Sequence, residues 1–291
     1  MRHLPPILIF VKMENREWFQ FLGFLSTPPL WLENEVFNLD QFTLPPVEFN
    51  RPSNLKEEIP SLESNFVLGK RIESFYSLVL QKSKPYSIIA QGMQIFSDKI
   101  TLGELDFLLQ KTGKEEVIHL EVVYKFYIYD PNINGELEKW IGPNRKDTLL
   151  KKLNKLEQKQ LPLLYREETL RATAALDIAG KAVKQQVSFL AHLFLPKDLQ
   201  QRDVPCINPE CLSGTWIHKS DFTKEDYGDC KFFIPLKQDW PIDPSKNDTW
   251  HSFQEIMPQV QRSLEAKKSP LIWMNDKSGI FERFFIVWWS K

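Results

Sequence analysis

The chain has 291 residues, of which 42% are hydrophobic and 26% are charged, and its formal net charge is −1 at pH 7. This composition is typical of a folded domain with a well-buried core, and the balanced charge excludes a protein whose overall field attracts polyanions. Three cysteines are too few for a disulfide framework, and no apolar run approaches the roughly 20 residues of a membrane-spanning helix. We therefore expect a cytoplasmic protein that has no membrane partner.

The N-terminal part combines one helix with a proline-rich segment. Residues 14–25 are predicted to form the helix, which Pro28 and the proline after it bring to an end. Further prolines interrupt residues 33–64, so this segment is expected to be extended and to wrap the surface. Met13 resembles a natural start, and residues 1–12 are interpreted as an upstream extension.

An amphipathic helix and three strands are predicted to follow. The helix begins near residue 65, because apolar side chains recur with a helical period along one face: Leu68, Ile72, Phe75, Tyr76, Val79 and Leu80. The strands are "YSIIAQGMQIF", "TLGELDFLLQ" and "EEVIHLEVVYKFYIY", and a hairpin turn, "KTGKEE", joins the last two.

A second helix is expected over residues 144–160, with Asn144 as its N-cap and Asp147 in the position of a capping box. Its faces carry an apolar and a basic stripe: Leu149, Leu153 and Leu156, and Lys151, Lys155 and Lys159. A short helix over "REETLRATAALD" leads into "QQVSFLAHLFLP", a strand that is apolar on both faces and therefore central. Because the crossover contains helices, this strand is predicted to lie parallel to the third strand.

Three regions are predicted along the chain. Residues 1–64 form the N-terminal helix and the wrapping segment, and residues 65–195 form an α/β core with a mixed sheet flanked by helices. Residues 196–291 form a β-rich extension with one helix near residues 251–266. The last strand of this extension is apolar on both faces, so the extension is expected to pack on the core.

Two apolar strands each carry a carboxylate in the middle, Asp106 in the second strand and Glu121 in the third. If these strands pair through the hairpin turn, the two side chains lie close together, and Glu104 shares the face of Asp106. Facing buried carboxylates repel, and a divalent cation relieves the repulsion. Oxygen ligands favour Mg²⁺ or Mn²⁺, which polarises a phosphoryl oxygen and activates a bound water. Lys125 follows on the face of Glu121, where an ammonium can orient that water or stabilise negative charge.

The Gly-Glu-Leu-Asp strand, the short turn and the strand with Glu and Lys resemble the PD-(D/E)XK nuclease superfamily. The order helix, three strands, helix, strand over residues 65–195 matches the restriction-endonuclease-like core of that superfamily. More closely, most of the chain resembles an uncharacterised bacterial family, domain of unknown function eighteen-fifty-three. The segments that carry this likeness are "LGKRIESFY", "LGELDFLL", "HLEVVYKFY" and "GPNRKDTLLKKL".

The resemblance implies metal-dependent hydrolysis of phosphodiester bonds in DNA or RNA. It implies a Mg²⁺ or Mn²⁺ ion held by Asp106, Glu121 and the main-chain carbonyl of Val122. It also implies a catalytic role for Lys125 and for Glu73, which matches the helix glutamate that some members use.

One departure from the superfamily concerns the lysine. The usual position is two residues after the acid, but Val123 stands there, and Lys125 lies about 7 Å further along the strand. A bulge in the strand would restore the reach of Lys125. Otherwise the role is empty, or it passes to Lys151 or Lys152 on the next helix.

Two other interpretations stay open. A nuclease-derived protein that has lost catalysis would bind nucleic acid or act as a scaffold, whereas a purely structural protein would hold the same acids in salt bridges. The basic residues Arg145, Lys146, Lys151 and Lys155 either contact nucleic-acid phosphates, helped by the helix N-terminus, or form a solvated helix face.

Four further residues are weaker candidates for a metal site. Cys206, Cys211, His218 and Cys230 are spaced more widely than the ligands of tight zinc knuckles, so the cysteines are interpreted as small buried residues. His192 lies inside an apolar strand and is interpreted as a core histidine with satisfied hydrogen bonds.

Overall fold

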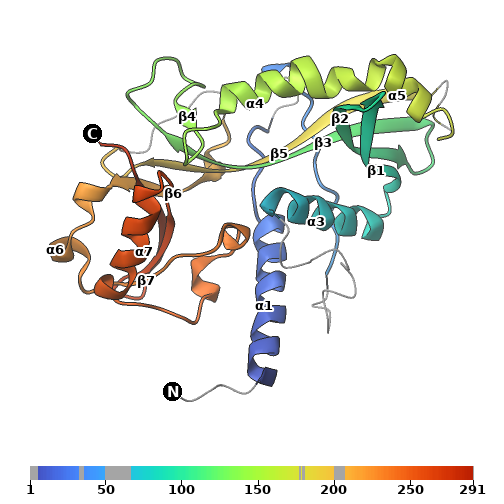
Figure 1. Cartoon of the computed structure of the whole chain (residues 1–291). Coiled ribbons are helices and arrows are strands. Elements are labelled where there is room, and N and C mark those ends of the chain that lie inside the picture. Colours follow the sequence, from blue (N-terminus) through green and yellow to red (C-terminus); the bar gives the residue numbers. More distant parts are fainter. Residues whose placement is uncertain are drawn as a thin grey trace.

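The computed structural model describes residues 6–32, 36–49, 67–176, 178, 181–199 and 207–290, with side chains from residue 16 onward. Within these ranges the chain is a mixed α/β protein built on one nine-stranded sheet with helices on both faces (Figure 1). The expected α/β class is therefore confirmed. Among the helices of the described ranges, none is long and apolar enough to cross a bilayer.

The sheet has the strand order β1-β2-β3-β5-β6-β9-β8-β7, and β4 pairs with β3 beside this path. Neighbouring strands are antiparallel except for the pairs β3–β5, β5–β6 and β6–β9, which are parallel. The strands are β1 (Tyr86–Ser97), β2 (Ile100–Lys111), β3 (Glu116–Tyr129), β4 (Trp140–Ile141), β5 (Ala182–Pro196), β6 (Leu212–His218), β7 (Lys231–Phe233), β8 (Leu271–Asn275) and β9 (Phe281–Val287).

Helices cover the two faces of the sheet (Figure 1). The α-helices are α1 (Pro6–Leu25), α3 (Leu68–Lys82), α4 (Leu149–Lys155), α5 (Glu167–Ala172), α6 (Lys224–Tyr227) and α7 (Phe253–Glu265). A π-helical turn, η2 (Leu156–Gln160), continues α4, and the 3₁₀ turns are η1 (Val36–Asn38), η3 (Leu161–Tyr165), η4 (Pro209–Cys211), η5 (Lys219–Asp221), η6 (Lys237–Asp239) and η7 (Pro244–Lys246). Helix α1 ends at Leu25 as predicted, but it begins at Pro6 rather than at residue 14.

The alternation of side chains along β3 divides the core between the two faces of the sheet. Even-numbered apolar residues from Ile118 to Ile128 pack with α1 and α3, whereas odd-numbered ones from Val123 to Tyr129 pack with α4. β3 and β5 pair in parallel from Glu116 to Ile128 without a register shift, which confirms the predicted parallel neighbour. The alternation therefore places Glu121 on the α4 side of the sheet.

The helix predicted over residues 144–160 begins later than expected. α4 starts at Leu149, and the side chain of Thr148 caps it. Asn144 is not the cap, because its side chain accepts a hydrogen bond from the main chain of the C-terminal region. Arg145 has a φ of 57°, a conformation outside the right-handed helix, so the chain turns before the helix starts.

The helix also changes its winding where α4 ends. The predicted apolar stripe is confirmed, because Leu149, Leu153 and Leu156 are buried. From Leu156 to Gln160 the chain forms the π-helical turn η2, a feature that shifts the register of side chains and is frequent at functional sites.

Residues 27–32 and 36–49 cover a part of β5 that β6 does not reach. β6 pairs with β5 only from Leu193 onward. Before that point, Leu30 N–H donates to the carbonyl of Phe189 at 2.8 Å, and Phe42 N–H donates to that of Val187 at 2.9 Å. The N-terminal segment thus satisfies main-chain groups of a central strand that would otherwise be exposed.

The strands after residue 207 continue the same sheet. β6 lies beside β5, β9 lies beside β6, and β8 and β7 complete this end. Helix α7 begins with a capping box of Ser252 and Glu255 and covers these strands with a buried apolar face. The C-terminal region is therefore joined to the rest of the body through a continuous hydrogen-bonded sheet.

Candidate functional site

The strands β2 and β3 stop pairing next to Asp106. Their antiparallel register ends at Phe107 and Leu120. One step further, Asp106 Oδ2 accepts a hydrogen bond from Val122 N–H at 2.9 Å, so a side chain replaces the backbone ladder. The N–H and C=O of a strand residue point toward the same antiparallel neighbour, so the Val122 carbonyl also faces this gap.

Three carboxylates converge at the gap. Glu73 from α3, and Glu104 and Asp106 from β2, each offer an oxygen, and these oxygens lie within 4.8 Å of one another. Lys70 lies one helical turn before Glu73. Its Nζ donates to Glu73 Oε2 at 2.8 Å and to Glu104 Oε1 at 2.7 Å. The ammonium thus offsets part of the negative charge that the cluster brings together.

Two acids of the site have raised pKa values. Burial, and next the negative charge of Glu121, raise the pKa of Asp106 to about 7, although the hydrogen bond from Val122 N–H opposes this. Burial also raises the pKa of Glu73, while its contact with Lys70 lowers it by less. Asp106 consequently holds its proton to a higher pH than an exposed aspartate, because its charge is not fully compensated.

Glu121 is fully buried and is held by hydrogen bonds on both oxygens. Its Oε1 faces His119 Nε2 at 3.0 Å, and its Oε2 accepts from the side-chain amide of Gln160. Gln185 determines the histidine tautomer, because its Nε2 donates to the Leu161 carbonyl at 2.6 Å and to His119 Nδ1 at 2.9 Å. His119 Nδ1 is therefore the acceptor, and Nε2–H donates to Glu121.

Lys152 on α4 reaches the same region. Its Nζ donates to Gln160 Oε1 at 2.8 Å, and the other end of that amide donates to Glu121, so Gln160 links the ammonium to the acid. Burial lowers the pKa of Lys152 to about 8, although the charges of Glu121 and Asp106 favour the protonated form. The charges of Glu121 and of Asp106 thus both act on the protonation of Lys152.

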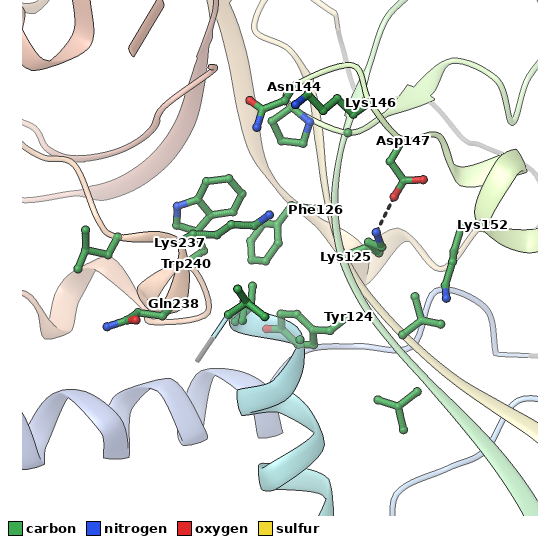
Figure 2. A pocket seen from close by; sticks show the side chains of 18 residues that line it. Tyr124, Lys125, Phe126, Asn144, Lys146, Asp147, Lys152, Lys237, Gln238 and Trp240 are labelled. Carbon is green, nitrogen blue, oxygen red and sulfur yellow. Dashed lines mark hydrogen bonds and ion pairs between the residues drawn. The ribbon is translucent and has the colours of Figure 1, made fainter. Parts of the chain in front are cut away.

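Lys125 lies further along β3 and pairs with another residue. Its Nζ contacts Asp147 Oδ2 at 2.5 Å (Figure 2). The bulge that would bring Lys125 back toward Glu121 is absent, because the β3–β5 register is uninterrupted from Glu116 to Ile128. Lys125 lies four positions after Glu121 along the strand, a distance of about 13 Å.

The four predicted phosphate-binding residues fall into two groups. Arg145 is held by the protein, because its Nη1 donates to Asp130 Oδ2 at 2.8 Å and its guanidinium lies 4.7 Å from the ring centre of Trp289. The remaining three are exposed lysines on α4 and the loop before it: Lys146, Lys151 and Lys155. Arg145 is therefore better explained by its structural contacts than by phosphate binding.

A cavity of about 750 Å³ shares residues with the carboxylate site. Lys152 lies on one side of it, and Lys237, Gln238 and Trp240 lie on the other (Figure 2). Val122 also belongs to the lining. Its charged side chains are Lys125, Lys146, Lys152, Lys237 and Asp147. Among the described residues of the lining, four lysines and one aspartate give a formal net charge of +3.

The cysteines of the weak zinc candidate and His192 lie in separate places. Cys206 lies outside the described residues, and Cys211 and Cys230 are free thiols that pack with different core clusters. His192 is buried, its Nδ1 is 2.8 Å from Ser213 Oγ and its Nε2 is 3.0 Å from Tyr124 Oη. Its interpretation as a core histidine is confirmed.

A protein family described as a domain of unknown function (DUF1853) matches residues 39–287. The chain belongs to this family. No curated protein and no solved structure matches the chain. The family match takes in every acid and lysine described above, from Lys70 to Lys237, and leaves α1 outside.

Several residues of the site carry little sequence signal. Glu104 shares a strand face with Asp106, so its place in the cluster follows from strand alternation alone. Lys70 and Gln160 are ordinary polar residues of helices, and only the packing of α3 and η2 brings them to the acids.

Proposed function

We propose that this protein is a divalent-metal-dependent nuclease with the restriction-endonuclease-like fold of the PD-(D/E)XK superfamily, acting on phosphodiester bonds in DNA or RNA. The observation that carries the proposal is the convergence of Glu73, Glu104 and Asp106 beside the half-buried Lys152, at the point where β2 and β3 part. The element order α3, β1, β2, β3, α4, β5 supports the proposed fold.

The donor atoms suit Mg²⁺ or Mn²⁺. The donors of the cluster are carboxylate oxygens, which these hard cations prefer. The three oxygens lie within 4.8 Å of one another, so Glu73, Glu104 and Asp106 would hold one such ion after movements of their side chains. Lys70 would have to release at least one of its two carboxylates. A bound ion would polarise a phosphoryl oxygen and make a water molecule more acidic.

The residues of the chain then have separate tasks. The hydrogen bond from Val122 N–H orients Asp106, and the hydrogen bonds from His119 and Gln160 orient Glu121. Lys152, whose pKa is about 8, carries a positive charge in most molecules at pH 7. A cation in this position stabilises the negative charge that develops on the phosphate during hydrolysis, the role that the displaced Lys125 leaves open.

The second candidate is a nuclease-fold protein that has lost catalysis and binds nucleic acid or serves as a scaffold. Two observations favour it. Val123 stands where the superfamily has its lysine, and both oxygens of Glu121 already accept hydrogen bonds from protein groups. Each carboxylate oxygen retains a second acceptor site, however, so Glu121 can still hydrogen-bond a water or approach an ion.

A cleavage assay separates the two candidates. Single- and double-stranded DNA and RNA are incubated with the protein in Mg²⁺, in Mn²⁺ or in EDTA. A nuclease cleaves at least one substrate only with metal, and Asp106→Asn abolishes the cleavage, whereas the exposed Asp229→Asn control leaves it unchanged. Binding of nucleic acid with no cleavage of any substrate would favour the inactive protein.

A further inference from the structure

The lysine-lined cavity has the size of a small-ligand site and shares residues with the carboxylate site. Its volume of about 750 Å³ lies within the roughly 300–1,000 Å³ of cavities that hold small ligands. A cavity of this size holds one or a few nucleotides of an unpaired strand rather than the whole width of a duplex. Val122 and Lys152 belong both to this lining and to the carboxylate site.

The lining combines positive charge with apolar surface. Lys237 extends across Trp240, with its Nζ 5.6 Å from the ring centre, and faces Lys125 and Lys146 across the cavity (Figure 2). The side chains of Val67 and Leu236, which also line the cavity, are 71% and 66% exposed. Cations for phosphates beside apolar surface for sugars and bases are what an unpaired nucleotide requires.

The wall that carries Lys237 is fixed in place. Asp239, in the same 3₁₀ turn, accepts from Arg16 Nε at 2.9 Å and from Gln20 Nε2 at 2.6 Å, and Arg71 Nη1 donates to Gln20 Oε1 at 3.2 Å. These contacts tie η6 to both α1 and α3. The cavity is therefore formed before any ligand arrives, which lowers the entropic cost of binding.

We propose that this cavity receives the unpaired end of the substrate strand and holds its backbone phosphates, so that the protein acts on strand ends or overhangs rather than inside duplexes. The inference rests on the proposed nuclease function and names its substrate class. A phosphate near Lys152 and Val122 lies next to the acids, so the strand that enters the cavity is also the strand presented for hydrolysis. Lys146 and Lys237 then act as phosphate contacts.

Binding measurements in EDTA test this without cleavage. The ligands are a fluorescently labelled blunt DNA duplex and the same duplex with a short 5′ or 3′ overhang. The wild type should bind at least one overhang about tenfold more tightly than the blunt duplex. In Lys146→Glu with Lys237→Glu this preference should disappear. The slope of log K for overhang binding against the logarithm of the salt concentration should become less steep by about 1.4, since each single-strand phosphate contact contributes about 0.7 to this slope. The exposed pair Lys224→Glu with Lys277→Glu is the matched control and should change neither quantity.

The outcomes separate this inference from the proposed function. Equal affinity of the wild type for all three ligands overturns the inference, as does an overhang preference that survives in the Lys146 and Lys237 variant. If metal-dependent cleavage is nevertheless observed, the nuclease proposal stands without it. An overhang preference that depends on these lysines, in a protein that cleaves nothing, overturns the nuclease and keeps the binding site. If the charge-reversal variant does not fold, Lys146→Gln with Lys237→Gln is measured in its place.

Discussion

The main-chain N–H of Val122 donates to Asp106 Oδ2 at 2.9 Å, in the position where a carbonyl of β2 would otherwise continue the ladder to β3. Asp106 is therefore held by the protein itself, whether or not an ion is present. Because an amide oxygen can accept the same hydrogen bond, Asp106→Asn changes the charge at this position while nearly keeping its shape.

Asp106→Asn should stabilise the protein at high pH in the absence of metal. The pKa of Asp106 is raised from 3.8 to about 7, so the native state binds the proton more tightly, and this group lowers the free energy of unfolding as pH rises from about 4 to about 7. A pKa shift of this size corresponds to a loss of about 4 kcal/mol in the free energy of unfolding. We expect a loss of about 2 kcal/mol, because the site relaxes when Asp106 is ionised. Urea unfolding should show the variant more stable by this amount at pH 8 and equal to the wild type at pH 4. A variant that is less stable at pH 8 would favour acids held in salt bridges.

Divalent metal should stabilise the wild type more at pH 8 than at pH 6. A ligand that binds only the native state raises the melting temperature, and a proton on Asp106, whose pKa is about 7, competes with the ion. Thermal unfolding with and without Mn²⁺ measures this increment. The increment should be lost in Asp106→Asn and kept in the exposed Asp229→Asn. An increment of the same size at both pH values would place the ion elsewhere.

Lys152→Met should abolish cleavage, whereas Lys125→Ala should reduce it by less than about tenfold. Methionine keeps the apolar stem of Lys152 but removes its positive charge, on which both acids act. Removing a group that stabilises a transition state lowers the rate by about a hundredfold or more. Lys125 pairs with Asp147 instead. Both variants should keep the Mn²⁺-induced rise in melting temperature. The reverse order of effects on cleavage would return the catalytic role to Lys125.

Lys151→Glu combined with Lys155→Glu tests the exposed face of α4. If this face contacts phosphates, nucleic-acid binding should weaken. The slope of log K against the logarithm of the salt concentration should become less steep by about 1–2. The free energy of unfolding should change by no more than about 0.5 kcal/mol for each substitution, because both side chains are exposed. Unchanged affinity and salt dependence would show that the stripe is only a solvated helix face.

Arg145→Ala should destabilise the protein by about 1–3 kcal/mol without weakening nucleic-acid binding. The Asp130 side chain is 4% exposed, and removing its partner leaves a buried charge without an ion pair at that oxygen. Denaturant unfolding measures the loss, and the neighbouring exposed Lys146→Ala provides the control for stability. A stable variant with weakened binding would make Arg145 a phosphate contact after all.

The sequence by itself determined the elements that depend on local periodicity. The three strands from Tyr86 to Tyr129, helix α3 and the parallel neighbour β5 follow from apolar alternation, helical spacing and the length of a crossover. Asp106 and Glu121 stand out for a related reason, since an ionisable side chain interrupts an otherwise apolar strand. The start of α4 was predicted wrongly, because the pattern that favours Asn144 as a cap contains no signal for the positive φ of Arg145.

Only the tertiary structure decided which polar residues meet the acids. Lys70 and Glu104 are 34 residues apart, and Gln160 lies 39 residues beyond Glu121, so no local pattern relates them. The choice between Lys125 and Lys152 depends on the unbroken register of β3 and on the winding of α4 and η2, both of which are set by packing. The pKa values of Asp106 and Lys152 are likewise shifted first by burial, a property that exists only once distant elements have enclosed the side chains.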